Sequence, residues 1–344
     1  MKQLITGNEA VARGAWEAGV RFASAYPGTP STEILENIAT YKEIHSEWAP
    51  NEKTALESVI GASLAGARAI ASMKHVGLNV AADPFFTFAY IGVNAGAVVV
   101  TADEPGQFSS QNEQDNRNYA KAAMTPMFEP SDSQECKDML LDAFEISEQY
   151  DIPVLFRMTT RVCHSKSLVE LGERQDVPLK PYVKNIKKYV AVPANAGPMK
   201  VKVQANQALL KAYSNNCQWN RLEMNESGIG IICSGDCYLY AREVFGGDAS
   251  YLKLGFTNPL PDDLIREFAS KVQKIYIIEE NDPYIEEHVQ ALGIACDGKN
   301  IFPRNGEMKP EVIRSVMYGE KYAVDGEVRA AVIPRPPTLC AGCP

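Results

Sequence analysis

Short apolar runs alternate with longer helical patterns through the first 160 residues, and this alternation limits the fold more than any other feature of the sequence. Such a rhythm is typical of a parallel sheet whose strands are connected by helices that cover its faces. The expected strands are residues 22–26, 44–48, 68–74, 97–101 and 152–157. The expected helices are residues 8–20, one from 51, one from about 80, and residues 134–150. We therefore expect an α/β domain over residues 1–165.

A second unit with the same rhythm follows a stretch of different character. Residues 166–226 contain several prolines and one polar helical stretch near 204–223, which is typical of a connector. Apolar runs resume at residue 228, so residues 227–320 are predicted to form another α/β unit. The proline-rich residues 321–344 are expected to be an extended linker into a missing domain that would bind a diphosphate. The predicted fold class is two three-layer α/β/α domains with mainly parallel sheets.

Composition excludes several classes of partner. The 344 residues are 45% hydrophobic and 22% charged, as in a globular protein with room for two cores, and the formal net charge is −9. An acidic surface repels phosphate backbones and anionic lipids, so we expect binding to neither nucleic acid nor membrane surfaces. No apolar run approaches the roughly 20 residues of a spanning helix, and residues 1–7 lack a signal core. We expect a cytoplasmic protein.

The chain has eight cysteines, and two of them form a pair near its last residue. Six are expected to be reduced thiols, and the spacing of Cys233 and Cys237 is interpreted as chance. Cys340 and Cys343 form a C-x-x-C pair. This pair indicates half of a site whose other ligands would lie further along a longer chain.

The first expected strand runs into a turn with the sequence Tyr26-Pro27-Gly28-Thr29-Pro30-Ser31. Thr29 would cap the next helix, with proline at its first position. Ligands bind at the carboxyl ends of strands in open α/β sheets, and a helix N-terminus favours an anion such as a carboxylate. The alternative is a capped connection that binds nothing.

The helix expected from Asn51 begins with an acidic residue and carries small residues along one face. Ala55, Ser58 and Ala62 recur at helical spacing, which suits close contact with another subunit or domain. Glu52 has two interpretations. It could be a solvated carboxylate favoured by the helix dipole. Alternatively, burial in an interface would let it share a proton with a bound heterocycle.

Two further segments place polar residues near the same edge of the sheet. Lys74, His75 and Asn79 follow an apolar strand, although a lone histidine is more often structural. The polar loop 104–117 is either a surface loop or an active-site lid in which Arg117 could bind a carboxylate. The sequence contains no Walker loop, dinucleotide fingerprint, zinc cluster or hydrolase elbow. Any catalysis would therefore need an external cofactor.

Together these segments resemble the alpha subunit of indolepyruvate:ferredoxin oxidoreductases, within the 2-oxoacid:ferredoxin oxidoreductase superfamily. The most specific match is Met-Lys-His-Val-Gly-Leu-Asn at residues 73–79, because other 2-oxoacid members carry a TSGPG-like stretch there. The matching segments extend along nearly the whole chain and are residues 7–10, 26–31, 51–57, 73–84, 254–261, 279–283 and 335–344.

The resemblance implies roles for individual residues. The first domain would be like the pyrimidine-binding domain of thiamine enzymes, and the second like the transketolase C-terminal domain. Glu52 matches the catalytic glutamate that hydrogen-bonds N1′ of the cofactor's aminopyrimidine, with Tyr26 and Asn79 as further cofactor-binding residues. The substrate-binding residues would be Thr29, Lys74, His75 and Arg117.

The resemblance also implies a reaction with several cofactors. Aryl pyruvates such as indolepyruvate would be oxidatively decarboxylated to acyl-coenzyme A, with electrons passing to ferredoxin. The cofactors would be thiamine diphosphate with Mg²⁺, and iron–sulfur clusters in the complete enzyme. No G-D-G…N motif is present, so the diphosphate site would lie outside this chain. Cys340 and Cys343 resemble the opening pair of cluster ligands.

Partners and alternatives follow from the same resemblance. The expected partners are a beta subunit, ferredoxin, coenzyme A, and a second copy that forms a homodimer through the first domain. This chain alone is expected to be inactive. One alternative is a pyruvate or branched-chain 2-oxoacid enzyme, against which residues 73–79 argue. The other is a non-catalytic assembly module.

Overall fold

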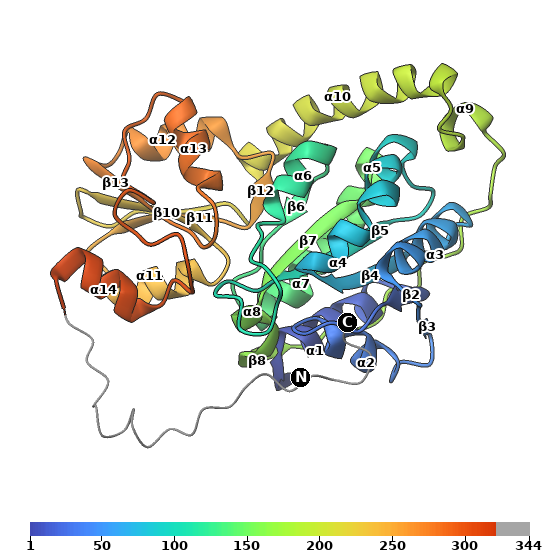
Figure 1. Cartoon of the computed structure of the whole chain (residues 1–344), viewed down its shortest axis with the longest axis horizontal. Coiled ribbons are helices and arrows are strands. Elements are labelled where there is room, and N and C mark those ends of the chain that lie inside the picture. Colours follow the sequence, from blue (N-terminus) through green and yellow to red (C-terminus); the bar gives the residue numbers. More distant parts are fainter. Residues whose placement is uncertain (321–344) are drawn as a thin grey trace.

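Figure 1 shows the computed structural model, which describes residues 1–320. Within these residues, a seven-stranded sheet with the order β12-β6-β7-β5-β4-β2-β3 lies beside a four-stranded sheet with the order β13-β10-β11-β9. Helix α10 (Pro193–Asn216) runs along the first unit to the second. The predicted α/β class with mainly parallel sheets is confirmed.

The seven-stranded sheet is parallel except for one strand. Its strands are β2 (Phe22–Ala25), β3 (His45–Trp48), β4 (Ala69–Lys74), β5 (Ala97–Asp103), β6 (Met127–Phe128), β7 (Val154–Thr159) and β12 (Phe256–Asn258). Only β12 pairs antiparallel, with β6. Strand β5 is buried throughout, with Val98 and Val100 in one hydrophobic core and Val99 in the other. Burial on both faces explains the continuous apolar runs of the sequence.

Helices cover both faces of this sheet. One face carries α1 (Gly7–Glu17), α2 (Thr32–Ile38), α7 (Ser133–Tyr150) and α8 (Thr160–His164). The other carries α3 (Glu52–Leu64), α4 (His75–Val80), α5 (Ala82–Ile91) and α6 (Arg117–Ala123). A separate two-stranded ribbon pairs β1 (Lys2–Thr6) with β8 (Lys166–Glu170).

The second unit is also a three-layer structure. Its strands are β9 (Arg221–Glu223), β10 (Ile229–Ser234), β11 (Ser250–Leu254) and β13 (Lys274–Ile278). Only β9 is antiparallel to its neighbour. Helices α11 (Cys237–Phe245) and α14 (Pro310–Tyr318) cover one face, and α12 (Asp262–Ala269) and α13 (Tyr284–Ala291) cover the other.

Several boundaries predicted from the sequence differ from those in the structure. Helix α1 is capped by Thr6, whose hydroxyl and the Glu9 carboxylate form a capping box, so Asn8 lies inside the helix. The helix expected from about 80 is two helices that meet at Ala81. The polar helix expected at 204–223 is α10, which begins at Pro193; its buried stripe starts at Met199, ahead of the expected start.

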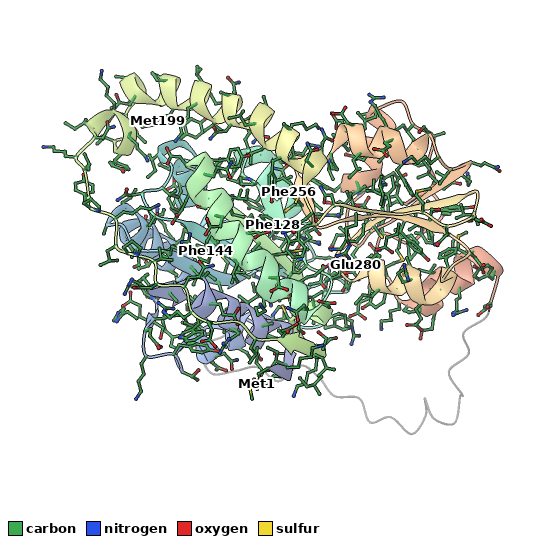
Figure 2. All side chains as sticks on the ribbon, turned by 180° about the vertical axis from the view of Figure 1, so that it is seen from behind. Met1, Phe128, Phe144, Met199, Phe256 and Glu280 are labelled. Carbon is green, nitrogen blue, oxygen red and sulfur yellow. The ribbon has the colours of Figure 1, made fainter. Side chains whose placement is uncertain are left out.

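The two units share a continuous boundary. Strand β12 follows the second unit's β11 in sequence but completes the first unit's sheet. At this junction Phe256 packs edge-on against Phe128, with ring centroids 5.0 Å apart (Figure 2).

The short helix α9 (Ile186–Tyr189) precedes α10. None of the helices in residues 1–320 combines the length and apolarity that crossing a bilayer requires.

Candidate active site

The carboxyl ends of four parallel strands gather the predicted site residues at one edge of the first sheet. In the parallel register, Ala25 of β2 pairs with Trp48 of β3 and Ser72 of β4, and Lys74 pairs with Ala102 of β5. The segments that follow these strands therefore meet. They are the turn 26–31, the start of α3, the start of α4 and the loop 104–116.

Glu52 is the first residue of α3 and is half-buried. Asn51 caps the helix by accepting a hydrogen bond of 2.9 Å from the Thr54 N–H. The Glu52 carboxylate lies against the backbone of α4, where a Cβ atom on Gly77 would be 2.6 Å from Oε1. Burial raises the pKa of Glu52 above its ordinary value, and a hydrogen bond from its own backbone offsets part of that rise. A carboxyl in this setting keeps its proton more readily than one in water.

Lys74 lies between the turn 26–31 and the loop 104–116. Its Cβ would be 3.2 Å from a Cβ on Gly28, so its stem packs against the turn. Its ammonium group is 3.8 Å from Glu104 Oε2 and 3.5 Å from the Ser109 carbonyl oxygen. Both contacts are longer than a typical charge-assisted hydrogen bond.

Thr29 is exposed in the same turn but does not cap α2, contrary to the sequence prediction. The Gly28 N–H donates to Thr32 Oγ1 at 2.9 Å, and the Ser31 N–H donates to the Gly28 carbonyl at 2.9 Å. The chain thus closes a turn before α2 begins at Thr32. Tyr26, predicted to bind the cofactor, is partly exposed beside this turn.

His75 is wholly buried, in contrast to the prediction that it lines a substrate pocket. Its Nε2 lies 3.1 Å from the Asn112 carbonyl oxygen, which requires that nitrogen to donate. The His75 carbonyl accepts hydrogen bonds from the side chains of Gln114 and Asn116. His75 therefore anchors the loop 104–116 through its ring and its backbone carbonyl.

Asn79, a predicted cofactor-binding residue, also contacts this loop. Its amide exchanges hydrogen bonds of 2.9 and 3.0 Å with Gln114, and Tyr119 donates to its oxygen at 2.6 Å. Because the residue is exposed, these bonds position the loop without burying the amide.

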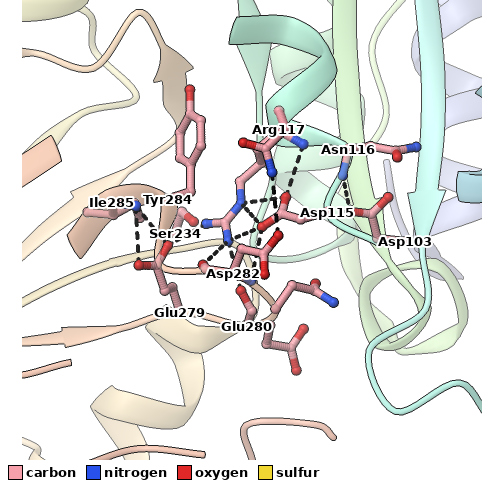
Figure 3. Close-up of polar contacts among 12 residues, drawn as sticks. Asp103, Asp115, Asn116, Arg117, Ser234, Glu279, Glu280, Asp282, Tyr284 and Ile285 are labelled. Carbon is pink, nitrogen blue, oxygen red and sulfur yellow. Dashed lines mark hydrogen bonds and ion pairs between the residues drawn. The ribbon is translucent and has the colours of Figure 1, made fainter. Parts of the chain in front are cut away.

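Arg117 was predicted to bind a substrate carboxylate, but each of its three guanidinium nitrogens donates a hydrogen bond within the protein (Figure 3). The side chain is 1% exposed. It binds the Asp115 carboxylate through Nε and Nη2, at 2.9 and 2.6 Å. Nη1 donates to Glu279 Oε2 at 2.7 Å, and Nη2 also donates to the Glu280 carbonyl at 2.8 Å. Arg117 thus joins the loop of the first unit to the end of β13 in the second.

A second buried arginine extends this network, which sequence reasoning did not find. Arg157 of β7 donates to Asp103 at 2.7 Å, to Glu129 at 2.6 Å and to Asn281 at 3.0 Å. Burial raises the pKa of Asp103 despite the nearby Arg157. The sequence did hold one signal: two acids directly after an apolar strand, at 279 and 280, need a buried cation nearby.

Beside this network, a cleft of about 590 Å³ opens between the two units. Its lining is polar and includes Gln107, Glu113, Gln114, Asn281, Asp282 and Arg304. Among residues 1–320, no three histidine, cysteine, aspartate or glutamate side chains are grouped to hold a metal ion. Cys340, Cys343 and the predicted linker 321–344 lie outside the described residues.

Comparison with known families gives one match over most of the chain. The family described as "Pyruvate flavodoxin/ferredoxin oxidoreductase, thiamine diP-bdg" matches residues 13–223. This range contains the whole seven-stranded sheet except β12.

Named relatives extend the similarity to the second unit. Indolepyruvate oxidoreductase subunit IorA of Methanothermobacter marburgensis is 44% identical, with the match covering 99% of this chain and 58% of that protein. The subunit of the same name from Archaeoglobus fulgidus is 39% identical, covering 100% of this chain and 59% of that protein. The chain therefore spans less than two thirds of the length of these relatives.

Solved structures agree with the fold. A 2-oxoglutarate:ferredoxin oxidoreductase from Magnetococcus marinus has a TM-score of 0.74 at 20% identity, covering 91% of this chain and 64% of that one. A split-gene transketolase has a TM-score of 0.56 at 14% identity, covering 90% and 93%. At these identities the likeness concerns the fold alone, and it agrees with the predicted α/β fold class.

Proposed function

The chain belongs to the pyruvate flavodoxin/ferredoxin oxidoreductase family, and from that premise we propose that it is the front part of the alpha subunit of an indolepyruvate:ferredoxin oxidoreductase. The complete enzyme would convert an aryl pyruvate and coenzyme A into acyl-coenzyme A and CO₂, and pass two electrons to ferredoxin. This chain would supply the residues that bind the pyrimidine half of thiamine diphosphate.

The placement of Glu52 supports this proposal most directly. Its carboxyl is half-buried, no cation within residues 1–320 forms an ion pair with it, and a glycine opposite leaves room for it. A carboxyl with a raised pKa can donate a proton to a ring nitrogen such as N1′. Thiamine diphosphate supplies the carbon nucleophile when bound. The donor set therefore fits the aminopyrimidine.

Lys74 and Thr29 are proposed to bind the substrate. The Lys74 ammonium is held only by long contacts, and Thr29 presents an exposed hydroxyl in the adjacent turn. Together they offer a positive charge and a hydrogen-bond donor to a 2-oxoacid carboxylate. Tyr26 and Asn79 are proposed to contact the cofactor at the borders of the same edge.

The remaining components are proposed to come from outside residues 1–320. They are the groups that hold Mg²⁺ and the diphosphate, the iron–sulfur clusters, a beta subunit and ferredoxin. The relatives' designation as subunits supports the partner subunit. We also propose that two copies of the chain form a homodimer through the first unit and that the protein is cytoplasmic.

The test is the Glu52→Gln substitution in the complete enzyme, assayed by indolepyruvate- and coenzyme A-dependent reduction of a viologen dye. Loss of a proton-transferring group lowers turnover by about 10²- to 10⁴-fold. The matched control is Glu57→Gln, which changes an exposed carboxylate of the same helix and should leave turnover unchanged. If Glu52→Gln retained full turnover, the assembly-module alternative would replace this proposal. A higher kcat/KM for pyruvate than for indolepyruvate would overturn the substrate assignment.

A further inference from the structure

Gly77 lies within α4 at the point where this helix meets the start of α3. The three heavy atoms nearest to a Cβ placed on Gly77 all belong to Glu52: Oε1 at 2.6 Å, Cγ at 2.7 Å and Cδ at 2.9 Å. No other side chain approaches this position as closely. The space that glycine leaves at position 77 is therefore filled by one carboxylate-bearing side chain.

The backbone itself does not demand glycine at position 77. Gly77 is not among the residues with positive φ, so an alanine could adopt its conformation. Inside a helix, glycine is also less favourable than alanine by about 1 kcal/mol. Helix stability would thus favour alanine at position 77. The contact with Glu52 is the feature that favours glycine there.

We infer that Gly77 is a positioning residue that holds the Glu52 carboxyl between α3 and α4, in the place where the pyrimidine would receive its proton. This inference rests on the proposed function and deepens it. A methyl group at 77 would displace the carboxylate, which is the flexible end of a side chain, while leaving the two helices in place. Because Glu52 is only half-buried, the displaced carboxylate would move toward water.

The neighbouring charges would not hold the carboxylate in its original place. Lys53 is paired with Asp83 at 3.1 Å and lies 3.9 Å from Glu57. Lys74 points toward Glu104, and the ring of His75 is bonded to the Asn112 carbonyl. Burial against α4 is therefore the main influence on the pKa of Glu52. We expect Gly77→Ala to expose the carboxylate and so to remove this influence.

The first experiment measures the titration of Glu52 in this chain by NMR of ¹³C-labelled glutamate carboxyls, with Glu52→Gln identifying the signal. In the unchanged chain the signal should titrate above the ordinary glutamate range, and in Gly77→Ala its midpoint should fall toward that range. Gly61→Ala is the control, because it also replaces a helical glycine but meets no atom within 4 Å. It should leave the Glu52 midpoint unchanged.

The second experiment measures turnover in the complete enzyme. Gly77→Ala should lower kcat by about 10²-fold, as expected for a misplaced proton donor, with little change in KM for the 2-oxoacid. Gly61→Ala should have no effect. An unchanged Glu52 midpoint together with unchanged kcat in Gly77→Ala would overturn the inference. If Glu52→Gln itself kept full turnover, the proposed function would fail, whereas the midpoint shift would still report the contact.

A double-mutant cycle covers the case in which Gly77→Ala destabilises the chain. Urea unfolding is compared for Gly77→Ala in the unchanged chain and in a Glu52→Ala background. If the clash is with Glu52, the destabilisation should disappear in that background. Destabilisation of the same size in both backgrounds would mean that Gly77 serves general packing, and the inference would be wrong.

Discussion

The ammonium group of Lys253, in β11 of the second unit, lies 2.6 Å from the Glu135 carboxylate, in α7 of the first. The Lys253 side chain is fully buried, and Glu135 also accepts a hydrogen bond from the Ser131 backbone. The Lys253–Glu135 and Arg117–Glu279 ion pairs therefore join the two units through buried charges at two separate places.

Replacing Lys253 with methionine should therefore destabilise the chain strongly. The substitution leaves the Glu135 carboxylate buried with only the partly exposed Arg221 near it, at 3.3 Å. Breaking a buried ion pair from one side costs about 3–5 kcal/mol, which urea unfolding can measure. Lys271→Met is the control, since its pair with Glu267 is exposed and should contribute less than about 1 kcal/mol. Equal effects for the two substitutions would contradict the buried-pair interpretation.

Arg117→Lys should fail to replace arginine. The guanidinium binds Asp115 through two nitrogens while a third binds Glu279, and a single ammonium cannot reproduce this fork. We expect a loss of about 2–5 kcal/mol in unfolding free energy and faster proteolysis within the loop 104–116. Arg304→Lys, at the rim of the neighbouring cleft, is the comparison and should change neither quantity. Unchanged proteolysis in Arg117→Lys would show that the loop is held by other contacts.

Glu148 should contribute stability that disappears in acid. Burial alone would raise its pKa, but Arg68, the Gly96 N–H and Lys180 outweigh burial and lower the pKa to about 2. Its folded-state pKa lies below the unfolded value, so the contribution is present above about pH 4.5 and is lost as the pH falls toward 2. Glu148→Gln should therefore be destabilising by about 1–3 kcal/mol at pH 7. The difference between the two proteins should shrink in unfolding curves measured from pH 5 to pH 3.

Glu52 should show the opposite behaviour, because its pKa is raised by burial. Its folded-state pKa lies above the unfolded value, so the ionised carboxylate destabilises the fold once the pH rises through that range. Glu52→Gln should raise the unfolding temperature at pH 7, and this gain should be smaller at pH 4. A loss of stability at pH 7 would mean that the carboxylate makes favourable contacts within the chain. If Glu52→Gln raises the unfolding temperature at pH 7 and also lowers turnover, the substitution has exchanged function for stability.

Local patterns predicted the sheet and the start of α3 because their causes are local. Apolar runs mark buried parallel strands, and Asn51 caps its helix with its own side chain. The sequence also placed Glu52 at a helix start. It could not reveal that Gly77 faces this residue, because the contact depends on how α3 and α4 pack.

The role of Arg117 depends on an ion pair between distant parts of the chain, which local sequence patterns do not show. Arg117 and Glu279 are 162 residues apart, so no local spacing relates them. An arginine in a polar loop is typical of an anion site, and its burial by a second unit changes that interpretation. The burial of His75 also depends on a distant part of the chain, since the loop that covers it begins about 30 residues later.

The position of β12 has a consequence for how the chain is made. The first sheet gains its edge strand next to β6 only when residues 256–258 are present. Until then a ribosome-bound chain would carry an open strand edge beside Phe128, which is a template for pairing between molecules. Synthesis as far as β12 is therefore also the step that covers this edge of the first sheet.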